Sequence, residues 1–89
     1  GQIVEGGFAA HGEQAFQNLN RALTAAGTSL DKVVKVTIFV TDMGEFNTIV
    51  DLRRKHFSAP YPADSIVEIK ALYTPEAMIE IEAIALVDD

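Results

Sequence analysis

Three short runs of the chain alternate apolar and polar residues or are rich in β-branched residues, which is typical of β-strands. The first covers residues 33–40 (VVKVTIFV), the second residues 65–69 (SIVEI) and the third residues 77–87, in which Glu80 and Glu82 alternate with isoleucines. In the first run we expect Lys35 and Thr37 on one face of the strand. On the opposite face we expect Val34, Val36, Ile38 and Val40.

Two other segments space their apolar residues as helices do. Residues 13–26 carry a single apolar stripe, and Gly27 follows at a position where helices commonly end. Asp42 stands three residues before Glu45, which indicates a helix start, and residues 59–62 (APYP) end that helix because proline cannot continue it. The first stripe comprises Ala15, Phe16, Leu19, Ala22, Leu23 and Ala26. The second comprises Phe46, Ile49, Val50, Arg53 and Phe57, and it is apolar apart from Arg53.

The order helix, strand, helix, strand, strand predicts one α+β domain over residues 1–89. Helices that pack on one face of a mixed sheet give a two-layer sandwich. The pattern of residues 1–3 (GQI) is typical of the end of a further strand. In addition, a sheet that covers two helices needs more than three strands. We therefore expect N-terminal strands of the fold to be missing from this chain.

Composition narrows the classes of function. The chain has 89 residues, a net charge of −6 and no cysteine, which disfavours nucleic-acid binding and fits a cytosolic protein without disulfides. No apolar run approaches the roughly 18 residues of a membrane span. His11 and His56 have no ligand neighbours at metal-binding spacing, and Gly6-Gly7 is too short for a phosphate loop. We expect no metal, no cofactor, no membrane partner and no nucleic acid.

Several segments together resemble the RidA/YjgF family of reactive intermediate deaminases, also described as endoribonuclease L-PSP. The resemblance implies a chorismate-mutase-like α+β fold and a homotrimer with a ligand cleft at each subunit interface. It also implies hydrolysis of 2-imino or 2-enamino acids to keto acids and ammonia. The matching segments are residues 1–3 (GQI), 14–19 (QAFQNL), 25–40 (AAGTSLDKVVKVTIFV), 43–46 (MGEF), 62–69 (PADSIVEI) and 79–85 (IEIEAIA).

The resemblance also implies site residues. Glu80 corresponds to the water-orienting glutamate of the family, while Asp64, Ser65 and Ile66 form the expected substrate-binding segment, with the backbone at Ile66 available to a ligand. Asp64 stands where the family has an arginine that pairs with the substrate carboxylate, and Val50 stands where an asparagine often lines the cleft. An acid repels a carboxylate, so the substrate is expected to differ from the usual 2-imino acid.

Each position also has a plainer interpretation. Glu80 and Glu82 also fit a solvated sheet face, Asp64 a strand-entry residue after a proline, and residues 53–56 (RRKH) a basic helix end that complements the helix dipole. Two classes of function follow. One is a divergent imine or enamine deaminase with Glu80 as acid or base, and the other is a non-catalytic homotrimer that binds a small metabolite. A ribonuclease would need a basic surface that this acidic chain lacks.

Overall fold

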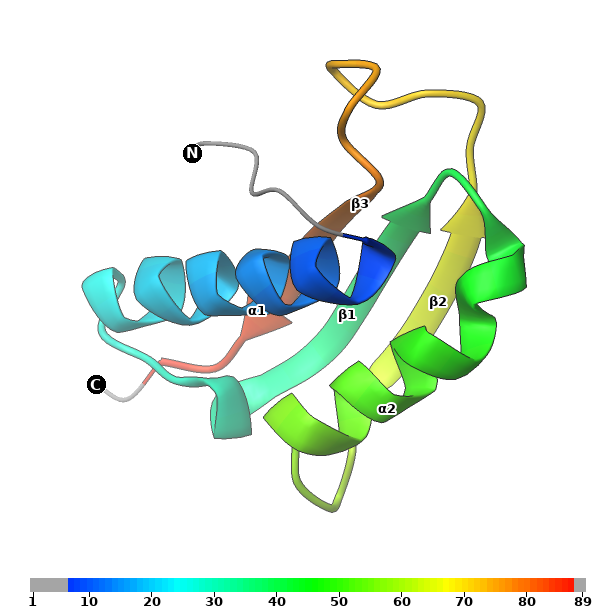
Figure 1. Ribbon diagram of the computed structural model, residues 1–89. Coiled ribbons are helices and arrows are strands. Elements are labelled where there is room, and N and C mark those ends of the chain that lie inside the picture. The colour runs from blue at the N-terminus through cyan, green and yellow to red at the C-terminus, as the bar shows by residue number, and fades with distance from the viewer. Residues whose placement is uncertain (1–6, 88–89) are drawn as a thin grey trace.

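The computed structural model describes residues 7–87, which form two helices and a three-stranded sheet (Figure 1). Both helices cover the same face of the sheet, so the predicted two-layer α+β fold is confirmed for this part of the chain. The predicted strand end at residues 1–3 lies outside the described residues. In chain order the elements are α1 (Phe8–Ala25), η1 (Leu30–Lys32), β1 (Val33–Val40), η2 (Met43–Glu45), α2 (Phe46–His56), β2 (Ala63–Glu68) and β3 (Ile79–Ala85). The elements η1 and η2 are short 3-10 helices.

The sheet is mixed, as predicted, and has the order β2-β1-β3. The central strand β1 runs parallel to β2, with Ile38 opposite Ile66, and antiparallel to β3, with Ile38 opposite Ile81. The parallel connection between β1 and β2 passes through α2, which is the usual way to join parallel strands. The registers of the two strand pairs therefore determine which side chains lie next to one another on each face of the sheet.

The core lies between the helices and this covered face of the sheet. Its members come from every major element except β2, whose Ile66 packs against the core while half-buried. Five large side chains in this layer are fully buried: Phe16 from α1, Ile49 from α2, and Val36, Ile38 and Val40 from β1. The predicted alternation on β1 therefore holds from Val36 onward.

Val34 departs from the predicted alternation. It is 45% exposed, whereas its neighbour Val33 is buried at 6%. The reason is a β-bulge, since Val33 pairs with Ala85 but Lys35 pairs with the adjacent Ile84. The extra residue on β1 moves Val33 to the core side and leaves Val34 outside.

The helices also differ in part from the predicted stripes. α1 begins earlier than expected and buries Phe8 and Gly12, with Leu52 of α2 close to Gly12. A Cβ added at Gly12 would lie 2.3 Å from Leu52 Cδ1, so a glycine there lets the helices approach. Among residues expected on the buried stripes, Ala22, Ala26 and Phe46 are exposed, and Ala26 lies just after the last residue of α1.

The predicted end of α1 at Gly27 is confirmed. Gly27 has a φ of +86°, which an L side chain rarely adopts. Its N–H donates to the Thr24 carbonyl at 3.1 Å, and the Thr28 N–H donates to the Leu23 carbonyl at 2.9 Å. This is a Schellman ending, in which the left-handed residue turns the chain back to satisfy the last carbonyls of the helix.

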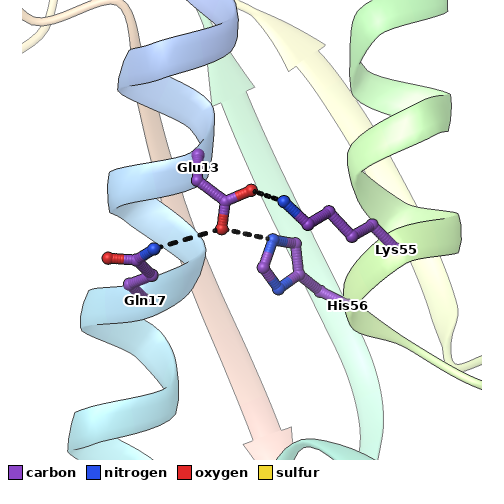
Figure 2. A network of polar contacts seen from close by, with 4 residues as sticks. All are labelled: Glu13, Gln17, Lys55 and His56. Atoms are coloured by element: carbon purple, nitrogen blue, oxygen red, sulfur yellow. Dashed lines mark hydrogen bonds and ion pairs between the residues drawn. The ribbon is translucent and has the colours of Figure 1, made fainter.

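A polar network ties α1 to α2 at the solvent edge of the core (Figure 2). Glu13 Oε1 accepts from Lys55 Nζ at 2.5 Å, and Glu13 Oε2 lies 2.9 Å from His56 Nε2. Gln17, one turn along α1, also donates to Glu13 at 3.4 Å. The hydrogen bond from Lys55, with a smaller effect from His56, holds the pKa of Glu13 below its usual value despite some desolvation.

The imidazole of His56 joins this network to the core. Its ring stacks on Phe16 with the ring centroids 4.7 Å apart and the planes 3° from parallel. Phe57 meets the same Phe16 ring edge-on at 5.6 Å. The last turn of α2 is therefore fixed by specific partners, in addition to the favourable placement of its basic residues at a helix C-terminus.

We expect Glu13→Gln to lower the free energy of unfolding at neutral pH by about 1 kcal/mol, because an amide cannot bind Lys55 and His56 as strongly as a carboxylate does. The folded-state pKa of Glu13 lies below its unfolded value, so this stabilisation is complete above the usual glutamate pKa of about 4.3 and is lost as the pH falls through the folded pKa. Urea unfolding of both proteins should show a difference that disappears in acid.

Glu76→Gln is the matched control, because Glu76 is exposed in the segment between β2 and β3 and has no partner among residues 7–87. Its unfolding midpoint should match that of the wild type at both pH values. A Glu13→Gln protein as stable as the wild type at neutral pH would show that the network does not hold the helices together.

Candidate functional site

The two predicted acidic site residues lie on opposite faces of the sheet. Asp64 pairs with Val36, which is fully buried, so its side chain belongs to the face covered by the helices. Glu80 pairs with Phe39, whose neighbours Ile38 and Val40 both point into the core, so Glu80 lies on the uncovered face. Within a single copy of the chain, Asp64 and Glu80 therefore do not line one cleft.

The uncovered face carries three rows of side chains that run across the strands. The middle row is polar and joins Ser65, Thr37 and Glu82, as the pairing of Thr37 with each of the others shows. Polar and apolar groups are mixed in the flanking rows. These flanking rows consist of Ala63, Lys35 and Ile84 on one side and of Val67, Phe39 and Glu80 on the other.

Lys35 is the cationic residue of this face, and its side chain lies along the polar row. Its Nζ donates to Ser65 Oγ at 3.0 Å and to the Val36 carbonyl at 3.1 Å. A shallow hollow of about 200 Å³ is lined by Lys35, Thr37, Glu82 and Ile84 together with Ala83. The lining of this hollow thus includes one basic and one acidic residue, Lys35 and Glu82.

Glu80 borders a second hollow, of about 290 Å³, between β3 and α1. Its other lining residues are mostly apolar, with Leu19 and Ile79 among them. Glu80 is exposed, as is Glu82 two residues along the strand. Side chains at this spacing begin roughly 7 Å apart on the same face, so both carboxylates can reach one bound molecule.

Asp64 has a partner that the sequence does not reveal. Its Oδ2 lies 2.9 Å from Nε of Arg53, and the two side chains are 26% and 20% exposed. The ion pair connects β2 to the last turn of α2. Asp64 is therefore neutralised by a residue of its own chain, and Arg53, expected as a polar interruption of an apolar stripe, is the residue that does this.

Two further predicted site positions, Ile66 and Val50, lie on β2 and α2. Ile66 packs half-buried against the core, and β2 is an edge strand of the described sheet, so part of its backbone N–H and C=O groups points away from β1. Val50 is half-buried on α2. Backbone groups of this edge are accessible for hydrogen bonding to a ligand.

Residues 7–87 offer no group of three histidine, cysteine, aspartate or glutamate side chains that could hold a metal ion. Within the same residues, no helix is both long and apolar enough to cross a lipid bilayer. What the uncovered face does provide is a cation, two hydroxyl groups and two carboxylates, which is a set suited to proton transfer and to binding a small polar molecule.

The family model described as Endoribonuclease L-PSP matches residues 1–87. Among curated proteins, the human 2-iminobutanoate/2-iminopropanoate deaminase is 37% identical over 86 residues, which cover 97% of this chain and 62% of that protein. The mitochondrial protein mmf1 of Schizosaccharomyces pombe is 41% identical over 88 residues, which cover 97% of this chain and 54% of mmf1. The chain thus spans less than two thirds of these relatives.

Solved structures give the same result. RidA from the Antarctic bacterium Psychrobacter sp. PAMC 21119 superposes with a TM-score of 0.88 at 36% identity, covering 94% of this chain and 68% of that one. A member of the YjgF/YER057c/UK114 family from Mycobacterium tuberculosis superposes with a TM-score of 0.89 at 33% identity, covering 94% of this chain and 71% of that one. The similarity therefore extends over nearly all of the described fold.

The Arg53–Asp64 pair predicts the outcome of charge reversal. Asp64→Arg places two guanidinium groups together, and we expect it to lower the free energy of unfolding by about 1–2 kcal/mol, a value between those of exposed and buried pairs. The double variant Arg53→Asp/Asp64→Arg should recover most of this loss. A double-mutant cycle measured by chemical denaturation gives the coupling energy.

Arg54→Asp supplies the matched control for the helix, since Arg54 is exposed, adjacent in sequence and without a partner among the described residues. Combined with Asp64→Arg it should give an additive loss with no recovery. Additivity of the Arg53 and Asp64 changes would contradict a stabilising pair.

Proposed function

Because the chain belongs to the RidA/YjgF family, also described as Endoribonuclease L-PSP, we propose that it hydrolyses a reactive imine or enamine to a carbonyl compound and ammonia. Support comes from relatives named as 2-iminobutanoate/2-iminopropanoate deaminases, which are similar along 97% of the chain. The observation that carries the proposal on this chain is Glu80, an exposed carboxylate of the uncovered sheet face that also borders the hollow between β3 and α1.

The reaction requires one water molecule and no redox partner. Water oxygen forms a bond to the imine carbon while Glu80 accepts a proton from the water. The same carboxyl group returns the proton to the nitrogen, which gives a carbinolamine. Glu80 then takes the proton of the carbinolamine hydroxyl group and passes it to the nitrogen, so the carbon–nitrogen bond breaks and ammonia leaves as the carbonyl forms. An enamine first takes a proton on carbon and gives up one from nitrogen to become the imine, and Glu80 or solvent can supply the first proton and accept the second.

We infer a substrate other than the usual 2-imino acid. In such an acid the carboxylate adjoins the imine carbon and, by the resemblance, would be held at the position of Asp64. Here that position carries a negative charge, and the nearby guanidinium of Arg53 is already engaged by it through Nε. A carboxylate placed there would meet a neutralised pair instead of a free cation.

The second candidate is a non-catalytic homotrimer that binds a small metabolite in clefts between its subunits. Asp64 favours it, since the expected carboxylate clamp is absent at that position. Both candidates use the same protein assembly and the same uncovered face. Release of ammonia from imines generated in place by an amino acid oxidase separates them.

For the enzymatic proposal, Glu80→Gln should reduce the rate of ammonia release by about 100-fold or more, the usual contribution of a general acid–base residue. The assay needs a panel of imines that includes substrates with and without a carboxylate beside the imine carbon. Glu76→Gln, which changes an exposed glutamate of a loop, should keep the wild-type rate. A Glu80→Gln protein with unchanged turnover would exclude Glu80 from the chemistry.

For the assembly, we expect a trimer at micromolar concentration by light scattering. The physical reason is that the uncovered side of the sheet and the segment after β3 expose several large apolar side chains. These are Val34, Val67, Ile84, Leu86 and Val87, which are 39% to 64% exposed. A monomer at this concentration would contradict both the trimer and a cleft between subunits.

A further inference from the structure

The cations of the described chain differ in what already neutralises them. Arg53 is paired with Asp64 and Lys55 with Glu13. Lys35 has only neutral partners among the described residues, the Ser65 hydroxyl and the Val36 carbonyl. It is also the one basic residue on the three strands, so it supplies the positive charge of the uncovered sheet face.

The surroundings of Lys35 suit a carboxylate. Its Nζ is held 3.0 Å from Ser65 Oγ, so the ammonium and a hydroxyl group lie together as two donors. Thr37, which pairs with Ser65 across the strands, adds a second hydroxyl beside the hollow of about 200 Å³. An ion-paired carboxylate that also accepts hydrogen bonds from hydroxyl groups is bound more strongly than one held by charge alone.

The register fixes how far this cation lies from Glu80. Lys35 pairs with Ile84 of β3, and Glu80 lies four residues before Ile84 on the same strand, where it pairs with Phe39. At about 3.4 Å per residue this is roughly 14 Å between backbone positions. The Nζ of Lys35 is held at Ser65 of β2, whereas Glu80 lies on β3 at the other edge of the sheet. Their charged ends are therefore farther apart than the single bond that joins the carboxylate to the imine carbon in a 2-imino acid.

We propose that Lys35, with Ser65 and Thr37, is a carboxylate-anchoring site, and that the ligand is an imino or oxo acid whose carboxylate is several bonds away from the reacting carbon. The substrate class rests on the proposed function of Glu80, whereas the binding site for the carboxylate does not. This arrangement explains how an acidic residue can stand at position 64, because the carboxylate of the ligand is bound on the opposite face of the sheet. Glu82, across the hollow, disfavours a second carboxylate in the ligand.

Binding of stable oxo compounds tests the anchor without any turnover. The full chain in its native assembly is titrated with 5-oxohexanoate, with 2-oxobutanoate and with uncharged 2-hexanone, by calorimetry or by NMR line shifts. We expect 5-oxohexanoate to bind about 10-fold or more tightly than either of the other two, as a charge-assisted hydrogen bond provides. Equal affinity for 5-oxohexanoate and 2-hexanone would overturn the proposal.

Variants assign the effect to the residue. Lys35→Met should remove the preference for 5-oxohexanoate over 2-hexanone, and Lys35→Arg should keep most of it. Lys70→Met, which removes an exposed lysine after β2, should bind like the wild type. If Lys35→Met does not fold, Lys35→Gln serves in its place, and an unchanged preference in the folded neutral variant would overturn the proposal.

The same set of proteins separates this site from the deaminase activity. Glu80→Gln should retain the binding of 5-oxohexanoate while it loses ammonia release. If the wild type binds 5-oxohexanoate through Lys35 but releases no ammonia from any imine, the anchor stands and the enzymatic proposal fails. If ammonia release depends on Glu80 while binding is indifferent to Lys35, the anchor fails and the enzymatic proposal stands.

Discussion

Burial of the sheet on one side is the constraint on which the rest of the structure depends. Phe16 and Ile49, from the two helices, pack on Val36, Ile38 and Val40 of the central strand, and all five are fully buried. Because strand side chains alternate, this one layer also determines which residues are left on the other side. The polar row of the uncovered face is thus a direct result of hydrophobic packing on the covered face.

The charged groups follow the same division. On the helix side, the ion pairs Arg53–Asp64 and Lys55–Glu13 join elements that are distant in sequence, and each neutralises a group that would otherwise be partly desolvated. On the uncovered side, Lys35 and the two glutamates of β3 are not paired with one another in any contact of the described residues. Charges that complete the fold and charges available to a ligand are therefore kept on separate faces.

Much of this arrangement could be predicted from the sequence, because it depends on local patterns. Alternation along residues 33–40 placed Lys35 on the solvent side, and Gly27 ended its helix as expected. The exposed Val34 could not be predicted, since a bulge is set by the pairing of two strands. The contact of Arg53 with Asp64 also depends on tertiary packing, and the placement of Asp64 and Glu80 on opposite faces required the register between three strands.

Glu80 and Glu82 have a further consequence that is independent of any ligand. They lie on β3, an edge strand of the described sheet, whose outer backbone groups pair with no other strand among residues 7–87 and could pair with an edge strand of another molecule. Two carboxylates brought against the same two of a second copy would repel, so β3 resists open-ended strand association that would lead to aggregates. Residues considered for their chemistry thus also oppose pairing of two copies of the chain through β3.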